Sequence, residues 1–184
     1  MMREQGSDNM IPDKKNNAFV VWMTGISGSG KSTLAEKLYE FYKAQGFRVE
    51  HLDGDAVRSV FPQTGFSKKD RDEHIGRIGY VASLLERQGI IVIASFISPY
   101  KDARGLVRSM CRHFIEVYID TPLKECERRD PKGLYRKARA GQLQHFTGID
   151  DPYEIPESAE ITIHTEGLSV EDSFKELKAK LPSF

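Results

Sequence analysis

The sequence predicts a three-layer α/β domain built on a parallel sheet, and three observations support this prediction. Short apolar runs alternate with amphipathic stretches along the 184 residues. The run at residues 90–96 is dominated by apolar side chains, as in a strand covered on both faces. A glycine-rich segment separates the first expected strand from the first expected helix. Alternating strands and helices form βαβ units, whose strands run parallel and whose ligands bind beyond the carboxyl ends of the strands.

The first half of the chain supplies three expected strands and two long helices. The first helix has an apolar face at helical spacing and ends at Gly46, a normal position for a glycine after a helix. Ser67, with Asp70 three residues later, predicts the capped start of a long helix that Gly89 closes. The expected strands are residues 19–24, 48–52 and 90–96, and the first helix spans residues 31–45.

The second half continues the alternation, and its last helix carries Val170, Phe174, Leu177 and Leu181 on one side. The other expected elements are a helix from about residue 101 to 110, a strand at 114–119, a helix opened by Pro122, a basic helical stretch at 133–140, a loop through Pro156 and a strand at 160–164. Because no linker or repeat divides the chain, we expect one domain at residues 18–184 after a flexible tail at residues 1–17.

Composition narrows the class of protein. Hydrophobic residues make up 39% and charged residues 29%, and 27 basic residues balance 27 acidic ones. A general nucleic-acid binder carries a basic excess, so we expect no nucleic-acid partner. Cys111 and Cys126 lack metal-ligand spacing and predict reduced thiols. No apolar run is long enough for a membrane span or a signal core, so we expect a cytoplasmic protein with no membrane partner.

The glycine-rich segment matches the pattern G-x-x-x-x-G-K-[ST], in which backbone N–H groups and a helix N-terminus hold phosphate oxygens. Lys31 would bridge the β- and γ-phosphates, and the Ser32 hydroxyl would ligate Mg²⁺. The predicted nucleotide site comprises Gly25, Ser27, Gly28, Ser29, Gly30, Lys31, Ser32 and Thr33. No N-K-x-D segment for guanine recognition is present, and the short chain argues against a motor, so a kinase is favoured.

A kinase also needs an acceptor site. Asp53 and Asp55 follow the second strand, where two carboxylates could support Mg²⁺ and accept the proton of an acceptor hydroxyl. The alternative is an acidic turn in which one aspartate caps the next helix. Arg58, Arg71 and Arg77 are spaced so that several could converge on an anion, or they could simply be solvated.

Six ordered segments carry a specific resemblance. They are GISGSGKST, LDGDAVR, GFSKKDRDEHIGR, SFISPY, ERRDPKGLYRKARAG and FTGIDDPYE. From about Phe19 onward the chain resembles the adenylylsulfate kinase family. The resemblance implies a P-loop kinase fold with sheet order 2-3-1-4-5, a small basic lid at about residues 128–150, usually a homodimer, and a role in sulfate activation. It implies transfer of the γ-phosphoryl group of ATP to the 3′-hydroxyl of adenylyl sulfate.

The resemblance also implies residue roles. Asp55 would orient or deprotonate the 3′-hydroxyl, with Asp53 supporting Mg²⁺. The remaining substrate contacts would be Arg58 and Arg71 at the phosphosulfate end, Phe66 and Phe146 around the adenine, His74, Ile97, Ser98, Thr147 and Gly148, and the lid residues Lys132 and Lys137, with Arg129 on ATP. The alternative for the two phenylalanines is that they pack in the core. The alternative for the basic residues of the lid is that they lie on an exposed helix. For the serine that matches Ser98, the resemblance also offers the alternative of a phosphoserine intermediate. A substrate contact is favoured because in-line transfer needs only positioning and charge neutralisation.

Two positions and one segment length depart from the family pattern. Ala56 replaces the Asn of D-G-D-N-[IV]-R, and His74 occupies the position of an Asn that contacts the substrate in the family. The segment between Arg58 and Phe66 is one residue shorter than usual. These changes bear on the identity of the acceptor. The alternatives are therefore a kinase for another nucleotide anhydride, such as cytidine diphosphoramidate, and a nucleotide-sensing module without catalysis.

Overall fold

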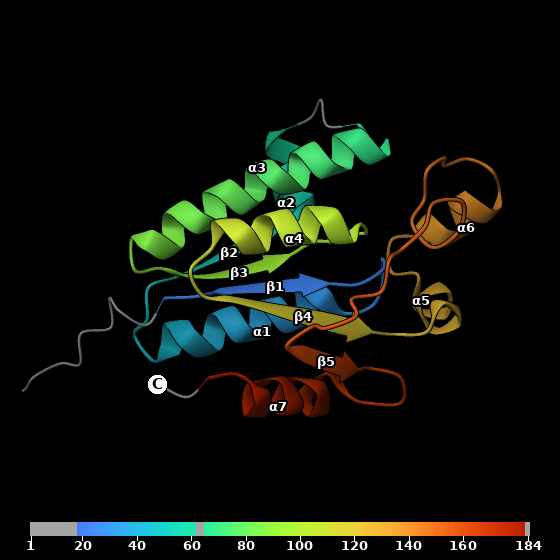
Figure 1. The fold of residues 1–184 in the computed structure, drawn as a ribbon. Coiled ribbons are helices and arrows are strands. Elements are labelled where there is room, and N and C mark those ends of the chain that lie inside the picture. The colour runs from blue at the N-terminus through green and yellow to red at the C-terminus, as the bar shows by residue number, and fades with distance from the viewer. Residues whose placement is uncertain (1–17, 62–64, 183–184) are drawn as a thin grey trace, which may run out of the picture.

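The computed structural model describes residues 18–61 and 65–182, and its five strands form one parallel sheet in the order β2-β3-β1-β4-β5 (Figure 1). The strands are β1 (Val20–Thr24), β2 (Val49–Asp53), β3 (Ile91–Ser95), β4 (Phe114–Asp120) and β5 (Ile161–His164). This order confirms the expected P-loop kinase topology. The expected tail at residues 1–17 lies outside the described residues.

Helices cover both faces of the sheet, which gives the predicted three layers (Figure 1). They are α1 (Lys31–Ala44), α2 (Gly54–Val60), α3 (Lys68–Arg87), α4 (Lys101–Met110), α5 (Leu123–Arg129), α6 (Leu134–Arg139) and α7 (Val170–Lys180). Side chains alternate across β1 and enter two separate cores. Val21 and Met23 pack with α1 and α7, whereas Val20 and Trp22 pack with α3 and α4. All four are fully buried, so this central strand fixes both layers.

The start of α3 is set by its predicted capping box. The Ser67 hydroxyl accepts a hydrogen bond from the backbone N–H of Asp70 (3.2 Å), and the Asp70 carboxylate accepts one from the backbone N–H of Ser67 (3.2 Å). Farther along, a Cβ on Gly79 would come within 2.6 Å of the Val107 side chain, so α3 and α4 approach closely at this glycine. The cap fixes where α3 begins, and the glycine contact packs the middle of α3 against α4.

Helix α2 was not among the expected elements. It is short and has no buried residue, so no apolar periodicity marks it in the sequence. Its N-cap is Asp53, whose Oδ1 accepts hydrogen bonds from the backbone N–H groups of Asp55 (3.0 Å) and Ala56 (3.3 Å). The capping interpretation of this acidic turn is therefore confirmed, and it places Asp55 in the first turn of the helix.

Helices α5 and α6 and the loop after them lie beyond the arrowheads of the sheet in Figure 1, at the carboxyl ends of the strands. This region spans most of the expected lid, and α6 coincides with the predicted basic helical stretch. Within the described ranges, no helix combines the length and apolar character that crossing a membrane requires.

Candidate active site

A cleft of about 1700 Å³ opens at the carboxyl ends of the strands. Small-molecule pockets commonly measure about 300–1,000 Å³, so this cleft has room for two nucleotide-sized ligands. The glycine-rich loop and the start of α1 form one wall, and α2, the first turns of α3 and the loop after β3 form the other. Residues of the expected lid line a further side of the cleft.

Two glycines give the phosphate loop its shape. A Cβ on Gly25 would lie 2.7 Å from the backbone oxygen of Ile119, so only glycine fits there. Gly30 has φ of +103° and is the N-cap of α1, where it has no side chain to cover the first helical N–H groups. Those N–H groups and the positive end of the helix are suited to bind an anion.

Lys31 is buried inside this loop, with 7% of its surface exposed. Its Nζ donates hydrogen bonds to the backbone oxygen of Ile26 (2.7 Å) and to the Ser29 hydroxyl (3.3 Å). Burial lowers the pKa of Lys31 to about 8. A cation held with so little hydration interacts strongly with an anionic group brought near it.

Ser32 and Asp53 form a pair of oxygen ligands beside the loop. The Ser32 hydroxyl donates to Asp53 Oδ2 (2.7 Å), and the Ser95 hydroxyl donates to the same oxygen (3.0 Å). Partial burial acts to raise the pKa of Asp53, but these bonds and the backbone N–H groups of α2 outweigh it and lower the pKa. The carboxylate is therefore kept ionised.

These oxygens fit Mg²⁺, which prefers oxygen ligands, keeps several waters and takes only one or two protein ligands besides substrate phosphates. Among the residues that the structure describes, no group of three or more His, Cys, Asp or Glu side chains could hold a metal by itself.

Asp55 lies across the cleft from the phosphate loop and forms an ion pair with Lys132, which lies between α5 and α6. The Asp55 side chain is exposed at the cleft surface, and both residues line the cleft. This pair joins α2 to the lid, and it brings a carboxylate and a lysine that are 77 positions apart into contact.

Arg58, Phe66 and Arg71 form a cationic and aromatic corner of the cleft. The guanidinium of Arg58 lies 4.6 Å from the centre of the Phe66 ring, and burial together with Arg71 lowers the pKa of Arg58. Arg77 does not join them. It pairs with Glu73 on the exposed face of α3 (3.4 Å), so the expected convergence involves Arg58 and Arg71 alone, because Arg77 lies on the outward face.

Arg71 is buried and connects α3 to the lid loop. Its Nε donates to the backbone oxygen of Phe66 (2.8 Å), and its other nitrogens donate to the Thr147 hydroxyl and the backbone oxygen of His145. Asp151 lies 3.5 Å from the same guanidinium. Arg71 thus fixes the segment that carries Phe146 and Thr147.

His74 contributes a buried polar atom to the acceptor side. The residue is 3% exposed and lines the cleft, and its Nε2 has no hydrogen-bond partner among the described residues. Its ring meets Phe96 and Phe61 edge-on, at 6.2 Å and 6.5 Å. Burial, with the charges of Arg58 and Arg77, lowers the pKa of His74. A neutral imidazole at this place can donate to or accept from a bound molecule.

The lid also touches the phosphate loop. Tyr135 of α6 donates a hydrogen bond to the backbone oxygen of Ser27 (2.8 Å), and the Phe146 ring packs edge-on against Tyr135 at 5.0 Å. Arg129 donates to the backbone oxygen of Thr165 (3.0 Å), which orients it along the cleft wall. Lid and loop are therefore in contact in this structure.

Most residues expected at the site line this one cleft, whereas Gly25, Lys137 and Gly148 are not among its lining residues. Gly25 shapes the loop from behind, and Lys137 is exposed on α6. Sequence reasoning missed Ser95 and Tyr135. Ser95 ends the strand next to the one that Asp53 ends, and the two residues are paired in the sheet register, which only the structure shows. No local pattern marks Tyr135.

Comparisons with known proteins agree with this geometry. The family model described as adenylylsulphate kinase matches residues 17–164. The chain is similar to an adenylyl-sulfate kinase of Picosynechococcus sp., with 49% identity over 168 residues that cover 91% of this chain and 95% of the relative. The fold is similar to that of the Mycobacterium tuberculosis APS kinase CysC in complex with AMPPNP and APS (TM-score 0.85, 41% identity, 90% of this chain and 98% of that one). It is also similar to a hexameric APS kinase from Thiobacillus denitrificans (TM-score 0.67, 34% identity, 89% of this chain and 28% of that one).

Proposed function

Because this chain belongs to the adenylylsulphate kinase family, we propose that it transfers the γ-phosphoryl group of ATP to the 3′-hydroxyl of adenylyl sulfate. The observation that carries this proposal is the single cleft in which the phosphate loop with Lys31 faces Asp55 and the pair Arg58 and Arg71. One wall suits a triphosphate. The other offers a carboxylate for a hydroxyl and guanidinium groups for an anion.

The chemistry follows from this placement. The 3′-oxygen of the acceptor bonds to the γ-phosphorus while the bond from that phosphorus to the β,γ-bridging oxygen breaks, and ADP leaves. Asp55 orients the hydroxyl and accepts its proton. Lys31 and the first N–H groups of α1 neutralise charge on the transferred group. Mg²⁺, held by Ser32 with Asp53 beside it, would supply further charge neutralisation when bound with ATP.

A direct assay tests the proposed function. The purified chain is incubated with MgATP and adenylyl sulfate, and in parallel with cytidine diphosphoramidate and other nucleotide anhydrides. We expect a 3′-phosphorylated product from adenylyl sulfate and the highest kcat/KM for that acceptor. A higher kcat/KM for another acceptor would instead indicate that His74 and Ala56 change the acceptor specificity. Tight ATP binding with no transfer to any acceptor would leave the sensing module as the function.

Phe146 is proposed to stack on the substrate adenine opposite Phe66, since both rings line the cleft. Phe146→Ala is expected to raise the KM for adenylyl sulfate about fivefold or more, because stacking of a base on an aromatic ring is worth about 1–3 kcal/mol. Initial rates with each substrate varied in turn measure it. Phe174→Ala is the control, since Phe174 of α7 packs against Phe41 of α1 and does not line the cleft. An effect of Phe146→Ala on the KM for ATP alone would contradict the stacking role.

The lowered pKa of Lys31 predicts a pH dependence. Burial disfavours the charged amine, so the free enzyme holds the cation below about pH 8 and loses it above that value. Since kcat/KM reports ionisations of the free enzyme, kcat/KM for ATP is expected to be level below pH 8 and to fall above it. Rates from about pH 6.5 to 9.5, with saturating acceptor, measure the profile. A level profile across this range would show that the charge of Lys31 does not limit capture of ATP.

Ser98 is proposed to contact the substrate rather than to carry a covalent phosphate. Its side chain is 2% exposed, and its hydroxyl oxygen accepts a hydrogen bond from the indole N–H of Trp22 (3.1 Å). A hydroxyl that is buried and already engaged in this way is poorly placed to attack phosphorus. Direct transfer between the two substrates needs no such intermediate. The homodimer, the magnesium requirement and the cytoplasmic location that the sequence predicts remain part of this proposal.

A further inference from the structure

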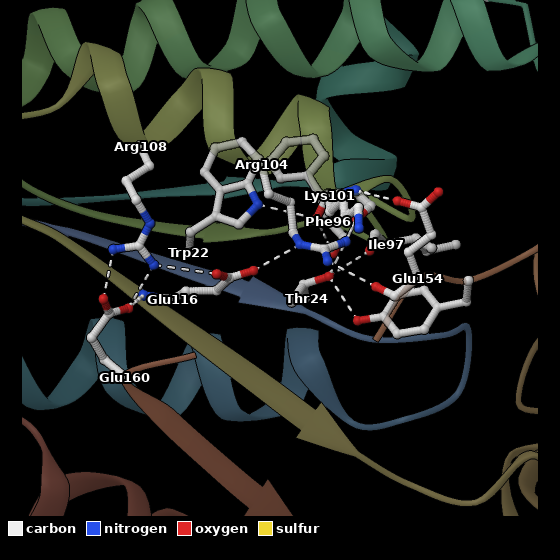
Figure 2. Close-up of polar contacts among 12 residues, drawn as sticks. Trp22, Thr24, Phe96, Ile97, Lys101, Arg104, Arg108, Glu116, Glu154 and Glu160 are labelled. Carbon is white, nitrogen blue, oxygen red and sulfur yellow. Dashed lines mark hydrogen bonds and ion pairs between the residues drawn. The ribbon is translucent and has the colours of Figure 1, made fainter. Parts of the chain in front are cut away.

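Figure 2 shows a polar cluster that is built around the buried residues Arg104 and Glu116. It joins α4 to the loop that directly precedes it and to a segment that is remote in sequence. The first, here called the β3 loop, is residues 96–100, and it contributes Ile97 and Ser98 to the cleft. The second, here called the return segment, is residues 152–156, which follow the lid loop. No part of the phosphoryl-transfer chemistry described above uses this cluster.

Arg104 of α4 is the centre of the cluster and is 3% exposed. Its Nη1 donates to the backbone oxygen of Ser98 (2.7 Å), and its Nη2 donates to the backbone oxygen of Glu154 (2.8 Å). Its Nε lies 2.7 Å from the carboxylate of Glu116, which balances the buried charge. One guanidinium fork therefore holds the β3 loop and the return segment together, as Figure 2 shows.

The backbone that Arg104 holds is strained. Ser98 has φ of +37°, in the left-handed region that side chains other than glycine seldom adopt. Such a conformation persists where its surroundings over-determine it. Besides the bond from Arg104, Thr24 Oγ1 donates to the backbone oxygen of Ile97 (2.7 Å), and Trp22 donates to the Ser98 hydroxyl. These bonds set the shape of the cleft surface that the acceptor meets.

The return segment is tied to the same place from its other side. The backbone N–H of Glu154 donates to the backbone oxygen of Pro99 (2.8 Å), and the Glu154 carboxylate accepts from the backbone N–H of Lys101 (2.7 Å). Only three positions earlier, Asp151 meets Arg71 and forms a bridge with Thr147. The chain thus runs directly from the Arg104 contact to the lid residues that line the cleft.

Arg108 provides a contrast within the same cluster. It lies one turn farther along α4 and pairs with the same Glu116 (3.2 Å) and with Glu160 (2.5 Å). Its contacts with Glu116, Glu160 and the Phe114 ring all lie away from the β3 loop and the return segment. Arg104 and Arg108 therefore share the network but differ in what they hold.

We propose that Arg104 is a positioning residue for the acceptor, one that aligns the β3 loop with the lid's return segment so that the acceptor hydroxyl meets the γ-phosphorus in line. This inference rests on the proposed function, because it gives Arg104 a role at the acceptor side of the same cleft. A lysine could keep the charge near Glu116, but it lacks the planar fork that reaches two carbonyl oxygens at once. The geometry thus requires arginine and not merely a cation.

The test compares Arg104→Lys and Arg104→Ala with Arg108→Ala. For the Arg104 variants we expect kcat/KM for the acceptor to fall on the order of tenfold for lysine and more for alanine, since a small misplacement of reacting groups is costly. The KM for ATP should stay within about twofold. Arg108→Ala should keep both acceptor and ATP parameters within about twofold, even if its melting temperature falls. The emission of Trp22, the single tryptophan, reports the state of the β3 loop without any activity.

Each outcome decides the inference. Native acceptor kinetics and native Trp22 emission in a folded Arg104→Ala protein would overturn it, and so would equal kinetic losses in the Arg104 and Arg108 variants. If alanine prevents folding, Arg104→Lys carries the test. If neither Arg104 variant folds, the residue is required for the fold itself and the positioning role is overturned. The wild-type assay alone decides the proposed function, whereas this inference depends on variant-to-wild-type ratios with whichever acceptor the wild type uses.

Discussion

Replacing Lys31 by alanine is expected to lower kcat on the order of 10²-fold or more, the size of effect seen when one preorganised donor is removed from a developing charge. Lys31 is the buried cation of the phosphate loop, and its Nζ is already held by Ile26 and Ser29 at the point where the terminal phosphates would lie. Because burial has removed most of its hydration, the amine needs little reorganisation to neutralise the transferred group. Steady-state turnover with both substrates saturating measures the loss.

Lys37→Ala is the matched control for this change. Lys37 lies on the same helix, but it pairs with Glu171 at the surface (2.5 Å) and does not line the cleft. Exposed ion pairs contribute little to stability, at most about 1 kcal/mol, so this variant should fold and turn over like the wild type. Equal activity of Lys31→Ala and Lys37→Ala would show that the Lys31 side chain does not act on the transferred phosphoryl group.

Asp55→Asn is expected to lower kcat by about 10²- to 10⁴-fold, the usual contribution of a positioned acid or base, while the KM for ATP changes little. The amide has the same shape as the carboxylate but cannot accept the hydroxyl proton. Asp55 lies across the cleft from the phosphate loop, so its loss should leave nucleotide binding intact. Single-turnover rates together with ATP binding measured by calorimetry separate the two effects.

Lys132→Ala distinguishes two roles of Asp55. If the carboxylate served only to hold the lid through its ion pair with Lys132, removing either partner would have the same effect. If it acts on the acceptor hydroxyl, Asp55→Asn loses far more activity than Lys132→Ala. Matching losses in the two variants would therefore assign Asp55 to the lid and remove it from the chemistry.

The elements of this fold that depend on residues close together in the chain could be predicted from the sequence. Apolar runs marked the strands, and the Ser67 capping box marked the start of α3. The glycine-rich loop was recognisable because its chemistry depends on contiguous residues. The strand order came from the family resemblance and not from hydrophobic periodicity, which carries no information about neighbours in a sheet.

The contacts that complete the cleft were out of reach for a physical reason. Arg71 meets Thr147 across 76 positions, and Tyr135 meets Ser27 across 108, so no local pattern records either bond. Helix α2 escaped notice because it is short and only Val57 packs against the core, so it has no apolar periodicity. Arg77 has the same spacing signal as Arg71 but lies on the outward face of α3, and only the direction of the side chain separates the two.

In the role proposed for Asp55 the carboxylate accepts a proton, and the ion pair with Lys132 places a positive charge beside it. Water is smaller than a ribose and always present, so every kinase faces futile hydrolysis of its phosphoryl donor. In the proposed mechanism the group that activates the nucleophile is Asp55, and the lid places a lysine beside it. An acceptor hydroxyl that takes the place of Lys132 would meet a carboxylate freed of its partner, and this exchange would couple consumption of ATP to arrival of the acceptor.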